Sequence, residues 1–309
     1  MGKRKGKTRR KKAKRKSGPK KDHRRRGAKA GTSKQRSTSS AEALPFLNPR
    51  ALEGTMFDLF GRGKGSALDR AQDMMYKAWD TPNRRGRVEL ALGALEVSRD
   101  CADAFVLLAE EAAPSLTDAL ELYQGGVEAG ERALGKEVFE EQVGHFWGLL
   151  ETRPYMRARA GLARCLWEAG EREQAVAHYN DLLRLNPGDN QGIRYVLAAC
   201  LLELGRDEEL ARLLEEYEDD ATAAWAYTAA LLAFRSQGES EGARRALTLA
   251  LEANKNVPPY LTGKKKLPPR LPDFAGFGDE NEAICYAADN KRAWQATTGA
   301  LAWLAANVQ

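Results

Sequence analysis

RARAGLARCLWEAGEREQAVAHYNDLLRLNP, residues 157–187, is the stretch that decides the fold of this chain. Its apolar residues follow the period of two short amphipathic helices, separated by Gly170, a residue suited to the left-handed conformation that ends helices. On the second helix, the small Ala175 allows close approach to the first, and Tyr179 fills the space one turn later. Pro187 ends the pattern. These features together are typical of a tetratricopeptide repeat.

The same landmarks recur twice further along the chain, at intervals of 35 and then 33 residues. The recurring positions are Gly170, Gly205 and Gly238 at the turn, Ala175, Leu210 and Ala243 at the close approach, and Tyr179, Leu214 and Leu247 one turn later. A helix pair cannot bury its apolar face alone, so such pairs stack on their neighbours. The sequence therefore predicts an all-α protein, a right-handed tetratricopeptide-like solenoid of helical repeats.

Composition divides the chain into four segments. Residues 1–40 hold 19 Lys and Arg against one acidic residue, Asp22, and have almost nothing to bury, which predicts a disordered basic tail. With +18 on this tail and +6 on the whole chain, the remaining residues carry −12. We expect a Gly- and Pro-punctuated linker over 41–66, helical repeats over 67–254, and a Pro-rich wrap with C-terminal capping helices over 255–309.

Enzymatic chemistry has little support in the sequence. Outside the tail only His145 and His178 remain, and neither has a nearby metal-ligand or Ser-His-Asp pattern. The four cysteines, 35 or more residues apart, lack metal-ligand spacing and suit the packed interior of a cytosolic protein. No apolar run is long enough for a membrane span, and the N-terminus lacks the apolar core of a secretory signal. We therefore expect a cytoplasmic protein without catalytic residues, cofactor or metal.

From about Tyr155 onward the chain resembles the suppression-of-tumorigenicity-7 family of tetratricopeptide-like proteins. The stretches that carry the resemblance are the opening one, LLELGRDEELARLLEEYEDD, AWAYTAALLAFR, VPPYLTGKKKLPPRLP, FGDENEAICYA and GALAWL. The chain departs from the animal members in having a basic tail where they have a membrane-spanning N-terminus, and it is more similar to soluble bacterial relatives. The resemblance implies a helical-repeat scaffold and brings no catalytic residues.

A protein-binding groove is the functional site that the repeats predict. The first helix of each pair is expected to line the concave surface, where arginines among aromatic residues can hold a partner segment. The candidate groove residues are Arg157, Arg164, Trp167, Tyr195, Trp225 and Arg235. For Trp167, Tyr195 and Trp225, packing between helices remains an equal alternative.

The basic tail supports a second hypothesis, association with RNA or another polyanion. A Lys- and Arg-rich segment neutralises phosphates without reading sequence, and the absence of aromatic residues excludes base stacking. The candidate contacts are Lys11, Lys12, Arg15, Arg24, Arg25 and Arg26. The alternative is a solubilising extension without a binding role.

Overall fold

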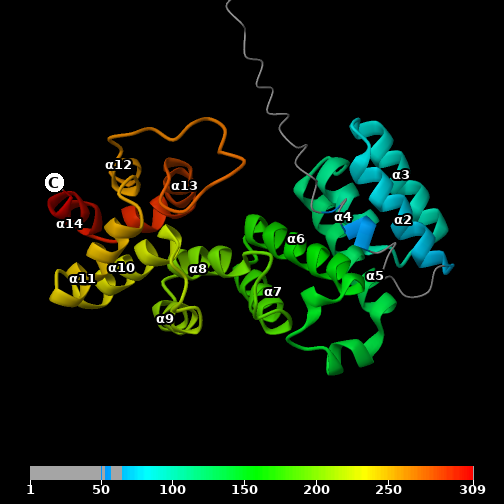
Figure 1. The fold of residues 1–309 in the computed structure, drawn as a ribbon, viewed down its shortest axis with the longest axis horizontal. Coiled ribbons are helices and arrows are strands. Elements are labelled where there is room, and N and C mark those ends of the chain that lie inside the picture. Colours follow the sequence, from blue (N-terminus) through cyan, green and yellow to red (C-terminus); the bar gives the residue numbers. More distant parts are fainter. Residues whose placement is uncertain (1–49, 51–52, 57–64, 309) are drawn as a thin grey trace, which may run out of the picture. The chain divides into compact units, whose positions relative to one another are not determined.

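The computed structural model describes residues 50, 53–56 and 65–308 (Figure 1). The tail and most of the predicted linker lie outside these residues. All regular structure in the described residues is helical, which confirms the all-α prediction. Five pairs come first: α2 (Ala67–Asp80) with α3 (Arg84–Val97), α4 (Ala102–Glu111) with α5 (Leu116–Glu141), α6 (Arg153–Ala169) with α7 (Arg172–Leu185), α8 (Ile193–Leu204) with α9 (Asp207–Glu216), and α10 (Ala223–Gln237) with α11 (Glu241–Ala253).

The predicted landmarks have the positions that a helical repeat requires. Gly170 and Gly205 end α6 and α8 in the left-handed conformation, and Gly238 ends α10 at a φ of 61°. The three close-approach residues, Ala175, Leu210 and Ala243, have no exposed surface. Each first helix packs on its own second helix, and successive pairs are in contact. The helical-repeat fold is therefore confirmed.

The stretch between α5 and α6 turns the chain with two short 3-10 helices, η1 (Phe146–Gly148) and η2 (Leu150–Thr152). Near the C-terminal end of α5, Gly135 leaves the helical conformation at a φ of 72°. Phe139, Phe146 and Tyr155 then form an aromatic cluster with ring centroids 4.9 to 6.2 Å apart. This cluster fixes the start of α6 against the end of α5.

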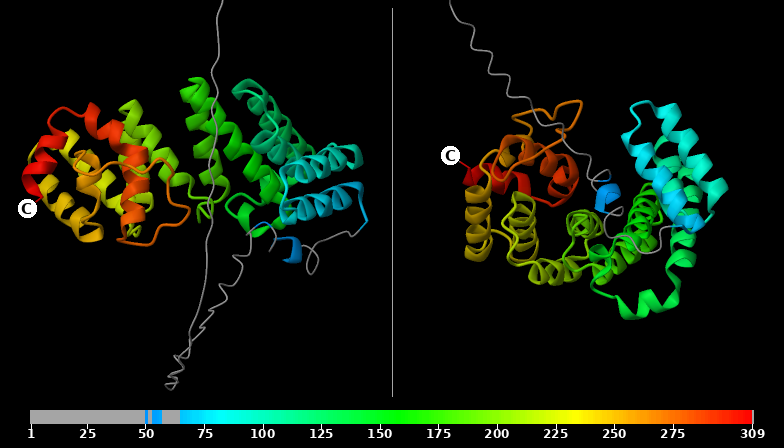
Figure 2. Two further views of the ribbon diagram at one scale, coloured as in Figure 1. Left: turned by 90° about the horizontal axis from the view of Figure 1, so that it is seen from above. Right: turned by 45° about the vertical axis from the view of Figure 1, so that its right-hand side comes forward.

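The C-terminal segment folds back onto the first helices. It contains α12 (Val257–Leu261), α13 (Glu280–Ala296) and α14 (Ala300–Asn307). The Pro-rich stretch starts as helix α12 because prolines fit the first turn, where no intrahelical donor is needed. Helix α13 packs against both α8 and α10, beside which it lies in Figures 1 and 2. The first-helix face of these two pairs is therefore covered by the chain itself.

Candidate partner-binding groove

The faces of α4, α6 and α8 that α13 leaves uncovered enclose two hollows. The first, of about 260 Å³, lies between α6 and α8, and the second, wider one lies between α6 and the α4–α5 pair. Glu110, Tyr123 and Arg164 line both hollows, so the two meet at these side chains. We call the two hollows together the Arg164 groove. Its walls come from three successive repeat pairs.

Among the described residues, Arg164 is the cation that lines both hollows of this groove. Its Nη2 donates a hydrogen bond of 3.0 Å to the hydroxyl of Tyr123, and its guanidinium carbon lies 5.9 Å from the centre of that ring. Arg164 is an exposed residue, and no described carboxylate forms an ion pair with it. Burial raises the pKa of Tyr123 to about 12, so the hydroxyl stays protonated near neutral pH. The remaining donors of Arg164 can therefore bind a carboxylate.

Arg157, in contrast, forms ion pairs with carboxylates inside the protein. Its Nε and Nη2 bind both oxygens of Asp103 at 2.8 and 2.7 Å, and its Nη1 binds Glu53 at 2.8 Å. Asp103 has no exposed surface, and the Arg157 guanidinium also lies over the ring of Trp79. Asp103 in turn accepts a hydrogen bond from Gln72. This network joins α2, α4 and α6, so Arg157 is tied to the packing of three helices.

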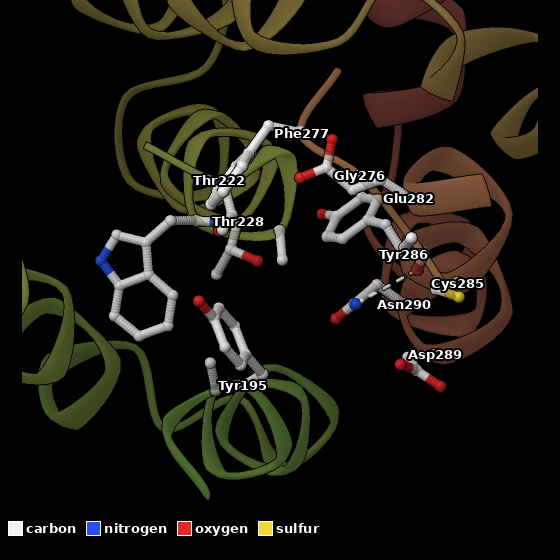
Figure 3. Close-up of a pocket in the computed structure, with 14 residues that line it drawn as sticks. Tyr195, Thr222, Thr228, Gly276, Phe277, Glu282, Cys285, Tyr286, Asp289 and Asn290 are labelled. Carbon is white, nitrogen blue, oxygen red and sulfur yellow. Dashed lines mark hydrogen bonds between the residues drawn. The ribbon is translucent and has the colours of Figure 1, made fainter. Parts of the chain in front are cut away.

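Tyr195 and Trp225 are brought together, with ring centroids 5.7 Å apart and planes at 88°. Trp225 is 4% exposed, while the hydroxyl of Tyr195 donates to Asp220 at 2.7 Å. Arg194 lies over the Tyr195 ring and pairs with Asp220. Both aromatic residues line a separate pocket of about 350 Å³, which α13 closes on one side (Figure 3).

Trp167 and Arg235 lie near the C-terminal ends of their helices and line neither the Arg164 groove nor the pocket that contains Tyr195 and Trp225. The guanidinium of Arg172 stacks 3.8 Å from the centre of the Trp167 ring. Arg235 donates to the carbonyl of Leu202 at 3.0 Å and pairs with Asp207 at 3.1 Å. Of the six candidate residues, Arg164 and Arg157 both line the groove, but Arg157 is held by the buried network. Tyr195 and Trp225 line a second pocket, and Trp167 and Arg235 lie at the helix ends.

Several groove residues escaped the sequence reasoning. Tyr123 follows the small-aromatic spacing of the repeats, yet that spacing indicates packing and gives no sign of a hydroxyl that binds Arg164. Gln191 lies in the turn before α8, outside any helical period in the sequence. Val196, on α8, is 43% exposed and lines the groove. Only the meeting of three helix pairs makes these side chains neighbours.

Other sequence expectations concern features outside the groove. The tail residues Lys11, Lys12, Arg15, Arg24, Arg25 and Arg26 lie outside the described residues. Within the described part of the chain, no group of His, Cys, Asp and Glu could hold a metal ion. No helix there is both long and apolar enough to cross a membrane.

The family model and the similar curated proteins point to the same family. The family model described as ST7 protein matches residues 58–308. A human suppressor of tumorigenicity 7 protein-like is 33% identical over 252 residues, which cover 74% of this chain and 43% of that protein. A protein ST7 homolog of Drosophila melanogaster is 29% identical over 266 residues, covering 77% and 48%. The chain thus spans less than half the length of these relatives.

Among solved structures, YrrB, described as a TPR protein with an unusual peptide-binding site, is 15% identical to this chain. The match covers 65% of this chain and 91% of that one at a TM-score of 0.43. A likeness this distant assigns no binding site here.

Proposed function

This chain belongs to the ST7 protein family, and from that premise we propose that it is a non-enzymatic scaffold that binds a segment of a partner protein in the Arg164 groove. One observation carries the proposal: an accessible guanidinium with unused donors lies where three repeat pairs meet. A cation held in this way gains most from a carboxylate that completes its hydrogen bonds. The proposed partner segment therefore carries an acidic residue at its centre.

The residues around Arg164 indicate two further features of the partner segment. Val196 offers an exposed aliphatic surface on α8, while Gln191 leaves a buried side-chain oxygen without a partner among the described residues. At the rim, the guanidinium of Arg50 binds the carboxylate of Glu110 through two nitrogens at 3.0 and 3.1 Å. A segment with a central carboxylate, a neighbouring aliphatic side chain and a free backbone N–H for Gln191 fits this arrangement.

The experiment compares the full chain with Arg164→Gln and with Arg212→Gln as a matched control. Arg212 is exposed on α9 and has no ion pair among the described residues, so it reports the loss of one positive charge alone. Proteins captured from a cell lysate at high salt are quantified, and the best candidate is then purified. Its affinity is measured by fluorescence anisotropy, and folding of each variant is checked by circular dichroism.

Loss of an arginine that anchors an interface commonly costs about 2 kcal/mol of binding or more, which corresponds to roughly thirtyfold in Kd. We expect that loss for Arg164→Gln and no measurable change for Arg212→Gln. If Arg164→Gln keeps every partner at the affinity of the unmodified chain, the Arg164 groove is not the binding site.

A second candidate function, polyanion binding by the tail, is favoured by the 19 Lys and Arg among residues 1–40. Such contacts release counterions, so their strength falls steeply with salt. Deleting residues 1–40 should abolish RNA retention at low salt and leave the groove partner bound. Replacing only Lys11, Lys12, Arg15, Arg24, Arg25 and Arg26 with glutamine should weaken that retention. Retention of RNA that is equal at both salt concentrations would contradict this candidate.

A further inference from the structure

The pocket closed by α13 lies apart from the Arg164 groove and has its own chemistry. Its walls come from α8, α10, the chain before α13, and α13 itself, and we call it the α13 pocket. At about 350 Å³, it falls within the size range of ligand-binding sites. Glu282 holds the pocket wall in place. Its carboxylate accepts hydrogen bonds from the backbone N–H groups of Ala223 and Gly278 and from the side-chain amide of Asn254. These bonds hold α13 to the start of α10.

A hydrogen-bond acceptor on a mostly buried residue faces this pocket. Asn290 is 7% exposed, and its Nδ2 donates to the backbone carbonyl of Tyr286 at 3.2 Å. Because a carbonyl can only accept, this bond fixes the amide with its oxygen on the opposite side. That oxygen has no partner among the described residues, and in Figure 3 it lies on the side facing Tyr195 and Thr228. The pocket therefore presents an acceptor that a ligand donor would satisfy.

The charge around the pocket favours a cation. Asp289 lies at the rim, forms no hydrogen bond or ion pair with the described residues, and is a second acceptor. No Lys, Arg or His occurs among the described residues that line the pocket. Arg194, which stacks on the outer side of Tyr195, is already compensated by Asp189 and Asp220. An anion would meet repulsion here, and a ligand without N–H or O–H donors would leave both acceptors unsatisfied.

Aromatic side chains complete the site. Tyr195, Trp225, Phe277 and Tyr286 line the pocket, and Phe277 is 82% exposed at its mouth. An ammonium or guanidinium group near aromatic faces is attracted by their electron density. A long aliphatic stem would cover the exposed Phe277 ring while the charged head reaches Asn290 and Asp289. From this arrangement we propose that the α13 pocket binds the cationic side chain of a lysine or arginine in a partner peptide.

The test measures binding of small probes to the full chain by saturation-transfer NMR and calorimetry. The cationic probes are Nα-acetyl-lysine N-methylamide and the corresponding arginine derivative. The norleucine derivative has nearly the same shape as the lysine probe but lacks the ammonium group. Cadaverine represents a free amine as the alternative source of the same cation. Asp289→Asn removes the rim charge, and Asp219→Asn is the matched control, since Asp219 is exposed and does not line the pocket.

We expect the lysine or arginine probe to bind and the norleucine probe to bind at least tenfold more weakly. Asp289→Asn should lower the affinity for the cationic probe about tenfold, because it removes a charge-assisted hydrogen bond. Asp219→Asn should change nothing. Binding of cadaverine alone would overturn the peptide side chain as ligand. Equal binding of the norleucine probe, or no binding of either cationic probe up to about 10 mM, would overturn the cation site altogether.

Discussion

Replacing Gly161 with alanine tests how closely α5 and α6 approach beside the Arg164 groove. A Cβ at this position would lie 2.0 Å from Cε1 of Tyr123 and 2.4 Å from two further ring atoms, far below van der Waals contact. The ring has little room to move because Tyr123 is 1% exposed and its hydroxyl is bound by Arg164. The two helices must therefore separate or the ring must leave its place.

The change in the free energy of unfolding caused by Gly161→Ala is the balance of two opposing effects. In a helix interior, alanine is favoured over glycine by about 1 kcal/mol. Overpacking of a closely packed core costs about 1–3 kcal/mol, and a contact as short as 2.0 Å places Gly161→Ala at the upper end. We expect the free energy of unfolding to fall by about 1–2 kcal/mol. The affinity for the groove partner should fall as well, because Tyr123 positions Arg164.

The assay is urea denaturation followed by circular dichroism, with Gly148→Ala as control. A Cβ at Gly148 meets nothing within 4 Å, so its free energy of unfolding should change by no more than about 0.5 kcal/mol. If Gly161→Ala raises the stability, helix propensity outweighs packing at this position and the close approach of α5 to α6 is refuted.

Three further perturbations test the fold. Asp103→Asn leaves the charge of Arg157 buried and should lower the free energy of unfolding by about 3–5 kcal/mol in urea denaturation. Asp100→Asn breaks an exposed pair with Arg132 and should lower it by about 1 kcal/mol or less. Ala175→Leu should lower the melting temperature clearly, since Ala175 is fully buried, while Glu171→Leu at an exposed position should have little effect. Burial and a neighbouring guanidinium lower the pKa of His178. Unfolding therefore takes up a proton, so stability should fall as pH drops below about 6.5, and His178→Gln should reduce that fall.

The sequence alone determined the helical-repeat fold, because its signals are local. A glycine that ends a helix, as Gly170 does, and a small residue five positions later, as Ala175 is, depend on the geometry of one helix pair and its nearest neighbour. The same spacing recurs at Gly205 with Leu210, where a larger residue takes the place of alanine, and again at Gly238 with Ala243. One packing scheme is consistent with all three pairs. The burial of Ala175, Leu210 and Ala243 follows from the same periodicity.

Only the tertiary structure decided which outward-facing residues are available to a ligand. Arg157 and Arg164 both lie on α6 and look alike in the sequence, since each is an arginine among apolar and small residues. Arg157 is buried because it meets Asp103, 54 positions away, and Glu53, 104 positions away, whereas no carboxylate of the described residues reaches Arg164.

The return of α13 onto α8 and α10 is equally invisible to periodicity. A helical period shows which face of a helix is apolar, but it carries no information about which distant helix covers that face. Glu282 fixes the choice through bonds to the start of α10 and the end of α11, and the same fold-back places Asn290 opposite Tyr195. The set of residues that lines the α13 pocket is therefore decided by long-range contacts of α13 with α8 and α10.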